Sequence, residues 1–148
     1  MYEEYLLCLA SKDDIDSWMR LVEIVKDDFP GLEISEYIRT LIKNIERETA
    51  LCVKCSEEVV GCILFSYHSK CLSCMAVHPD HRRKGIASAM VEKMISMFPK
   101  DIDISVTTFR EEDIKGIAPR ALYKKYGFVE GELVFEFNYP NQKFILRR

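Results

Sequence analysis

Residues 75–88 read Met-Ala-Val-His-Pro-Asp-His-Arg-Arg-Lys-Gly-Ile-Ala-Ser. The stretch starts as an apolar strand, continues as a basic loop and ends as the start of a helix. Gly85 and Ala87 carry very small side chains at the first helical turn, so an anion can approach the N–H groups that a helix start leaves unpaired. The helix dipole adds about half a positive charge at this end, and whole charges come from the adjacent Arg82, Arg83 and Lys84. The stretch therefore predicts a phosphate-binding loop; a basic turn that caps an ordinary helix is the alternative.

A second motif lies about 35 residues further on, where residues 121–128 read Ala-Leu-Tyr-Lys-Lys-Tyr-Gly-Phe. Leu122, Tyr126 and Phe128 suit packing on a core, and Gly127 supplies the left-handed residue that ends a helix. Core packing and helix termination explain the glycine fully and the aromatic residues only in part.

The two motifs, in this order, resemble those of the GNAT-type N-acetyltransferase superfamily. Arg82-x-x-Gly85-x-Ala87 is similar to its Arg/Gln-x-x-Gly-x-Gly/Ala loop, which holds the pyrophosphate of acetyl-CoA, and residues 122–128 are similar to its Leu-Tyr-x-x-x-Gly-Phe box. The resemblance implies that Tyr123 donates a proton to the departing CoA thiolate, and that Arg82 mainly braces the loop. It also implies cofactor contacts at ten positions: Met75, Ala76 and Val77 along the pantetheine arm, and Arg82, Arg83, Lys84, Gly85, Ile86, Ala87 and Ser88 around the pyrophosphate.

The chemistry of aminolysis suits a tyrosine at this place. Attack on a thioester needs a neutral amine, a stabilised carbonyl oxygen and a proton for the leaving sulfur, and a positioned general acid contributes about 10²–10⁴-fold. A tyrosine stays protonated at neutral pH and can donate. The resemblance thus predicts an acetyl-CoA-dependent N-acetyltransferase that acts on a primary amine in a ternary complex, without a metal.

The chain also departs from the family pattern. Gly116 stands where many members carry an asparagine that helps to hold the pantetheine arm, and the segment 110–116 is longer than usual. The strand that ends at Val77 lacks the glutamate that some members use as a base. Candidate replacements are His68, His78, Glu111 and Glu112, and deprotonation through water is equally open.

Length and composition predict one domain over residues 1–148. The net charge of −3 argues against general binding to nucleic acid. The first five residues lack the basic region of a secretory signal, and no apolar run approaches the length of a membrane span. We therefore expect a cytoplasmic protein with mostly free thiols.

Hydrophobic periodicity predicts an α/β (α+β) domain with a mixed, mostly antiparallel sheet flanked by helices, the element order of the GNAT fold. One helix is expected after Ser11, and a second carries apolar residues over 34–45. A third runs from the basic loop to Phe98, and a fourth covers 118–126. The expected strands cover about 5–10, 49–55, 58–67, 70–77, 102–108, 133–138 and 143–147.

Two cysteine pairs match the spacing of a four-cysteine zinc site, namely Cys52 with Cys55 and Cys71 with Cys74. Both pairs lie in segments that read as strands, where positions i and i+3 point to opposite faces. Neither segment has the glycine or proline that usually helps a zinc knuckle to turn, so we expect no metal there. A cysteine nucleophile stays open, because the sequence shows no activating partner.

A non-catalytic module that senses acyl-CoA is the main alternative function. The acceptor stays open among small amines, amino acids, peptide N-termini, lysine side chains and antibiotics. Glu132, Glu136 and Tyr139 suit either a cationic amine or a solvated strand face. An exposed C-terminal strand edge would allow a homodimer.

Overall fold

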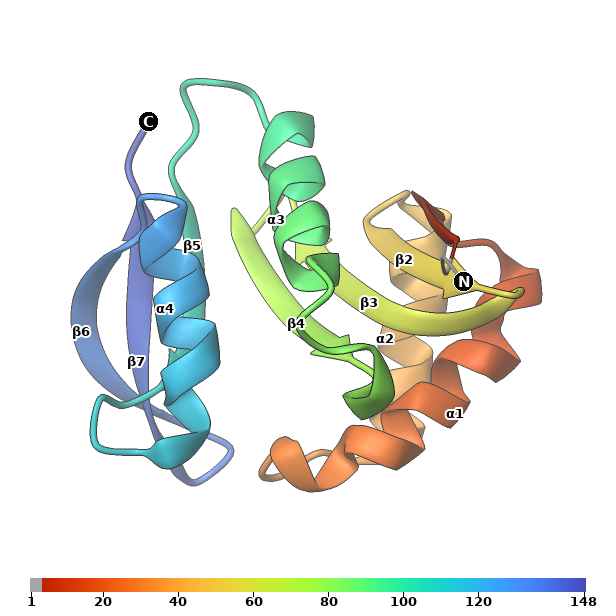
Figure 1. Cartoon of the computed structure of the whole chain (residues 1–148). Helices are drawn as coiled ribbons and strands as arrows, with labels where there is room; N and C mark the ends of the chain where they lie inside the picture. Colours follow the sequence, from red (N-terminus) through yellow and green to blue (C-terminus); the bar gives the residue numbers. More distant parts are fainter. Residues whose placement is uncertain (1–3) are drawn as a thin grey trace.

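Apolar runs form strands and amphipathic runs form helices over residues 4–148, which the computed structural model describes (Figure 1). Residues 1–3, on which the expectation about a secretory signal partly rests, lie outside the described residues. The strands are β1 (Tyr5–Leu9), β2 (Ala50–Cys55), β3 (Glu58–Ser66), β4 (Cys71–Val77), β5 (Ile104–Phe109), β6 (Val129–Glu136) and β7 (Tyr139–Leu146). The helices are α1 (Ile15–Val25), α2 (Ile34–Glu46), α3 (Ile86–Met97) and α4 (Ile117–Lys125), with short 3₁₀ turns η1 (Lys12–Asp14), η2 (Lys26–Asp28), η3 (Pro79–His81) and η4 (Ile114–Gly116).

The strands form one seven-stranded sheet in the order β1-β2-β3-β4-β5-β7-β6. Neighbouring strands pair antiparallel, apart from β4 and β5, which run parallel. The expected mixed, mostly antiparallel sheet is therefore confirmed. None of the described helices is long and apolar enough to cross a membrane.

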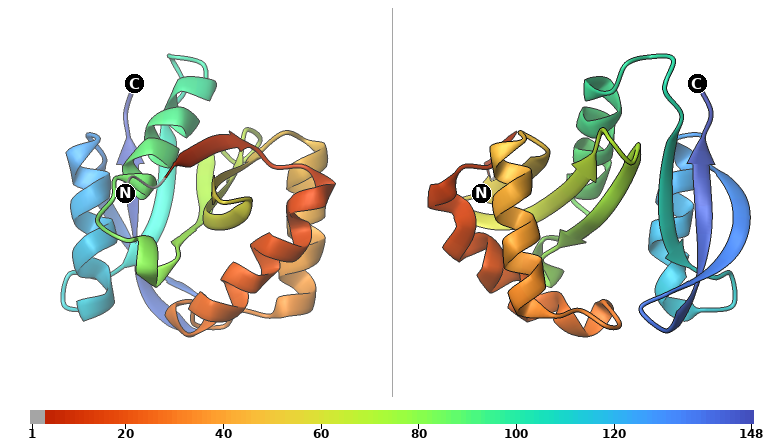
Figure 2. Two further views of the ribbon diagram at one scale, coloured as in Figure 1. Left: turned by 45° about the vertical axis from the view of Figure 1, so that its right-hand side comes forward. Right: turned by 180° about the vertical axis from the view of Figure 1, so that it is seen from behind.

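Helices cover both faces of the sheet. In Figure 1, α3 lies in front of the sheet, whereas α2 lies in front in the view from behind (Figure 2). One core lies under α3 and α4 and the other under α1 and α2. Because both faces are covered, β3 is buried from Val59 to Phe65 and reads as a continuous apolar run.

Local signals set several element ends as expected. The Asp14 carboxylate accepts the Ser11 N–H at 2.8 Å, which is one half of a capping box at the entry to α1. Gly127 has φ +92° directly after the last turn of α4. Both agree with the boundaries that the sequence indicates.

The bounds of the two strands in the C-terminal hairpin differ from those expected. The ranges 133–138 and 143–147 were too short and placed too late, because β6 begins at Val129 and β7 at Tyr139. The turn consists of Phe137 and Asn138, with φ +54° and +57°. Positive φ at both central residues is what a type I′ hairpin requires, and phenylalanine is not a residue that signals it.

Candidate active site

The strands β4 and β5 part in the middle of the sheet. Their pairing covers only two residue pairs and ends where Leu72 meets Val106. The next residue, Ser73, is a β-bulge, since Leu72 and Cys74 pair with successive residues of β3 and leave it without a partner there. A bulge bends and twists its strand, so β4 leaves β5 at this point. We call this place the fork; Figure 1 shows the two strands diverging.

Beyond the fork, β4 presents an unpaired edge. Its residues 73–77 pair with no strand on the β5 side within the described chain. The side chains of Met75 and Val77 pack toward the core under α3 and α4, and that of Ala76 toward the other core. Backbone groups alternate in direction along a strand, and the His78 N–H donates to the Val60 carbonyl of β3, so the backbone groups of Ala76 face β3 and those of Met75 and Val77 face outward. The Met75 groups and the Val77 N–H therefore remain available to an extended ligand, which can add to such an edge as a strand would. The Val77 carbonyl accepts from Arg82.

The loop after β4 turns sharply into α3. Arg83 has φ +64° and Gly85, the N-cap of α3, has φ +79°. The first helical hydrogen bond runs from the Ala89 N–H to the Gly85 carbonyl at 3.0 Å. The three N–H groups before it, from residues 86–88, therefore have no acceptor within the helix. A Cβ on Gly85 would meet no atom within 4 Å, so the space beside this helix start is open.

The side chains of the loop differ in their surroundings. Arg82 donates from Nε to the Val77 carbonyl at 3.2 Å, and its guanidinium lies 3.5 Å from the Asp28 carboxylate. This geometry matches a residue that holds the loop in shape. The side chains of Arg83 and Lys84 are exposed at its tip, whereas Ile86 is buried, so Ile86 offers only its N–H to a ligand.

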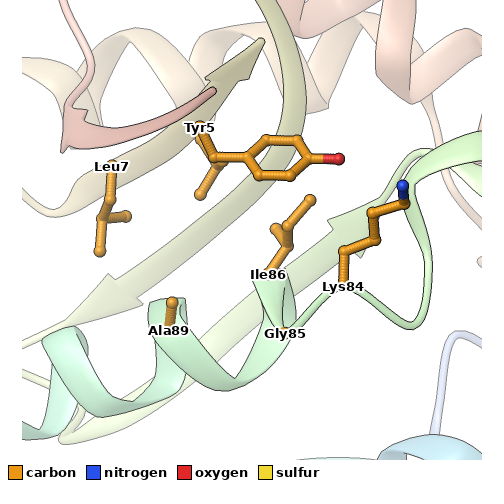
Figure 3. A pocket seen from close by; sticks show the side chains of 7 residues that line it. Tyr5, Leu7, Lys84, Gly85, Ile86 and Ala89 are labelled. Carbon is orange, nitrogen blue, oxygen red and sulfur yellow. The ribbon is translucent and has the colours of Figure 1, made fainter. Parts of the chain in front are cut away.

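A small pocket of about 150 Å³ opens on the β1–β2 side of the same helix start (Figure 3). In Figure 3 the Tyr5 ring lies over Ile86, and its hydroxyl end points toward Lys84. Leu7 and Ala89 complete the apolar wall. The pocket lies beside the basic loop and away from the fork, because β3 separates β1 and β2 from the fork.

Tyr123 lies on α4 with its ring in the core. The side chain is 4 % exposed and packs against Phe128 and Phe144, with ring centroids 5.7 and 6.3 Å away. Burial raises the pKa of Tyr123 well above its usual range, and the thiol of Cys74 adds to this. Tyr123 lies in the same core against which Met75 and Val77 of β4 pack, so its ring is on the α3–α4 side of the sheet.

The Tyr123 hydroxyl still reaches solvent. Within residues 4–148 every fully buried side-chain oxygen or nitrogen has a hydrogen-bond partner, and this hydroxyl bonds to none of those residues. It must therefore keep some exposed surface. A protonated, poorly solvated hydroxyl without an internal acceptor is suited to donate to a ligand atom.

A second tyrosine approaches the fork from the other face. Tyr37 on α2 accepts the Trp18 indole N–H at 2.9 Å, and its oxygen lies 3.9 Å from the Cys74 sulfur. Burial raises the pKa of the Cys74 thiol to about 11. This thiol is protonated at neutral pH, which disfavours it as a nucleophile. Sequence reasoning missed the contact, because nothing in the spacing of Tyr37 and Cys74 signals it.

Steric crowding explains the glycine at position 116, where many family members carry an asparagine. A Cβ there would lie 3.0 Å from Arg120 Cδ and 3.1 Å from both the Arg110 carbonyl and Phe109 Cβ. Arg120 fills this space and is itself buried, donating to the Phe109 carbonyl at 3.0 Å, to Gln142 Oε1 at 2.8 Å and to the Glu130 carboxylate at 2.9 Å. No feature of the sequence indicates that Arg120 faces inward, one turn before Tyr123.

The four candidate bases lie in turns and loops. His68 lies in the β3–β4 turn, and Glu111 and Glu112 follow β5. His78 uses Nδ1 to accept the Asp80 N–H at 3.0 Å. A base has to reach the acceptor amine, and no contact within residues 4–148 assigns one of the four to that place, so their role as a base stays a prediction.

The six cysteines are free thiols. Cys52 faces Cys8 across β1 and β2, with 3.8 Å between the sulfurs, and both lie on the face covered by α1 and α2. No group of three or more histidine, cysteine, aspartate or glutamate side chains is placed to hold a metal ion in the part of the chain that is described.

Comparison with known proteins assigns the family. The family model of the acetyltransferase (GNAT) domain matches residues 46–130, more than half of the chain. The chain belongs to the GNAT acetyltransferase family. Membership of this family indicates acyl transfer from acyl-CoA, and the resemblance of the two motifs is thereby confirmed. The matched range runs from the end of α2 to the start of β6 and includes the fork, the basic loop and Tyr123.

Solved structures confirm the GNAT fold. A GNAT-family acetyltransferase from Bacillus cereus is 23% identical, with a TM-score of 0.75 and coverage of 98% of both chains. Ard1 from Thermoplasma volcanium is 21% identical, with a TM-score of 0.76 and 95% of both chains covered. A chain of the NatC complex bound to Gag peptide and CoA is 21% identical, with a TM-score of 0.75 and coverage of 98% and 99%. A search of curated protein sequences finds no match to this GNAT chain.

Proposed function

We propose that the protein transfers an acetyl group from acetyl-CoA to a primary amine by direct attack in a ternary complex. One observation carries the proposal: the fork has an unpaired strand edge, an open helix start beside it and a buried tyrosine on the neighbouring helix. These three features supply the groups that the pantetheine arm, the pyrophosphate and the sulfur of a CoA thioester would each need.

The open start of α3 is suited to bind the pyrophosphate. The N–H groups of residues 86–88, the helix dipole and the charges of Arg83 and Lys84 all favour an anion there. The edge of β4 beyond the fork would pair with the amides of the pantetheine arm and leave a backbone N–H for the carbonyl oxygen that becomes negative during attack.

Tyr123 is proposed as the general acid. The amine attacks the carbonyl carbon, the carbon–sulfur bond breaks, and the Tyr123 hydroxyl gives its proton to the CoA sulfur. The burial that raises the pKa of Tyr123 keeps the hydroxyl protonated until the thiolate forms. The proton of the amine leaves through a candidate base or through water.

A panel of amines tests the proposal. Release of CoA from acetyl-CoA is followed by thiol titration, and the acetylated product by mass spectrometry. Peptides with free N-termini head the panel, because the NatC structure holds a peptide with CoA. Small amines, amino acids, lysine peptides with blocked N-termini and aminoglycosides complete it. Acetylated product for at least one amine supports the proposal. Tight CoA binding without transfer to any amine would favour the acyl-CoA sensor instead.

A further inference from the structure

The proposed donor site is divided between two halves of the sheet. The helix start that would hold the pyrophosphate belongs to α3, which packs on β2, β3 and β4. The proposed acid Tyr123 belongs to α4, which packs on β5. Because β4 and β5 separate at the fork, the distance between pyrophosphate site and acid depends on how α3 and α4 are held together.

Tyr126 connects these two helices. It is the C-cap residue of α4, three positions after Tyr123, and its hydroxyl donates to the Ser88 carbonyl at 3.4 Å. Ser88 lies in the first turn of α3, among the predicted pyrophosphate contacts. Within residues 4–148 no other hydrogen bond or ion pair joins α3 to α4 or to the C-cap residue of α4.

The hydroxyl of Tyr126 makes no other hydrogen bond within residues 4–148. Its ring is half-buried against the core under α3 and α4, and the Lys125 ammonium lies 5.5 Å from the ring centroid. A phenylalanine at this position would keep both contacts. The sequence assigns Tyr126 to core packing alone, so the bond to Ser88 is the part that packing does not explain.

We propose that Tyr126 is a positioning residue for acetyl transfer. By fixing the end of α4 to the first turn of α3, it holds the Tyr123 hydroxyl at the distance from the pyrophosphate site that the thioester sulfur requires. The inference rests on the proposed function, because it acts through Tyr123. Misplacement of a catalytic group by a fraction of an ångström lowers the chemical step more than binding, since the pyrophosphate contacts stay in place.

Tyr126→Phe is compared with Tyr67→Phe as a matched control. Tyr67 lies in the β3–β4 turn and its hydroxyl bonds to no described residue. We expect Tyr126→Phe to lower kcat about three- to tenfold, the worth of one hydrogen bond, with the Kd for CoA within about twofold. Tyr67→Phe should match the wild type, and thermal melting confirms that all variants are folded at the assay temperature.

A double-mutant cycle shows whether Tyr126 acts through Tyr123. In a Tyr123→Phe background, loss of the Tyr126 hydroxyl should cause no further fall in kcat. A wild-type kcat in Tyr126→Phe, or an equal fall in both backgrounds, would overturn the inference and leave the proposed function intact. A wild-type protein that transfers no acetyl group would overturn both.

Discussion

Gly85 offers the sharpest test of the pyrophosphate site, because two substitutions of equal size separate charge from shape. Its φ of +79° is strained for any other residue, but a Cβ there would meet no atom within 4 Å. Gly85→Glu and Gly85→Gln therefore carry the same backbone cost, about 1–2 kcal/mol. They differ only in a negative charge beside the start of α3.

The charge acts in opposite directions on folding and on binding. A carboxylate at a helix N-terminus stabilises the helix by about 0.3–1 kcal/mol, so Gly85→Glu should melt at or above Gly85→Gln. A carboxylate about 6 Å from a phosphate charge repels it by about 3 kcal/mol at an effective dielectric constant near 20. Screening by salt reduces this, so we expect about 1.5–3 kcal/mol, or about 10- to 150-fold weaker CoA binding than in Gly85→Gln.

Isothermal titration with CoA measures the two affinities, at low salt and again at high salt. The difference between the variants should shrink as salt is added. Equal affinities of Gly85→Glu and Gly85→Gln for CoA at low salt would refute the placement of the pyrophosphate at this helix start.

Three further predictions concern the tyrosines. Tyr123→Phe keeps the ring packing and removes the proposed proton donor, so kcat should fall about 10²–10⁴-fold while the Kd for CoA stays within about twofold; an unchanged kcat rules out the acid role. The raised pKa of Tyr123 means that its hydroxyl ionises only above the usual tyrosine range, so a pH–rate profile should show no loss of kcat from this group between neutral pH and about pH 9.5. A fall there that is absent in Tyr123→Phe would contradict the buried, protonated state. Tyr37→Phe removes the acceptor of the buried Trp18 N–H and should lower the free energy of unfolding by about 1–3 kcal/mol in urea; a stability equal to the wild type would contradict the Trp18–Tyr37 bond.

The sequence predicts the local features of this fold well, because they depend on local chemistry. Gly85 in the basic loop and Gly127 at the end of α4 both have the left-handed backbone that glycine adopts readily. The C-terminal hairpin was misplaced for a physical reason: β6 is an edge strand with most of its residues exposed, so it lacks the alternation that marks a half-buried strand. Its turn is formed by Phe137 and Asn138, which do not carry the usual Asn-Gly signal.

The candidate site is predicted less completely, because its parts meet through long-range contacts. The motifs indicate Tyr123 and the loop, but not the bulge at Ser73 that opens the sheet between them. The contacts of Tyr37 with Cys74 and of Tyr126 with Ser88 join residues 37 and 38 positions apart. Pairs of this kind carry no periodic signal and follow only from the packed structure.

A crystal structure of the protein with CoA would locate every part of the proposed donor site. We expect the pyrophosphate to accept hydrogen bonds from the N–H groups of residues 86–88 and the pantetheine arm to run along β4 beyond the fork. The CoA sulfur should lie within hydrogen-bond distance of the Tyr123 hydroxyl. A sulfur atom away from Tyr123, or a pyrophosphate bound elsewhere than at the start of α3, would contradict this arrangement.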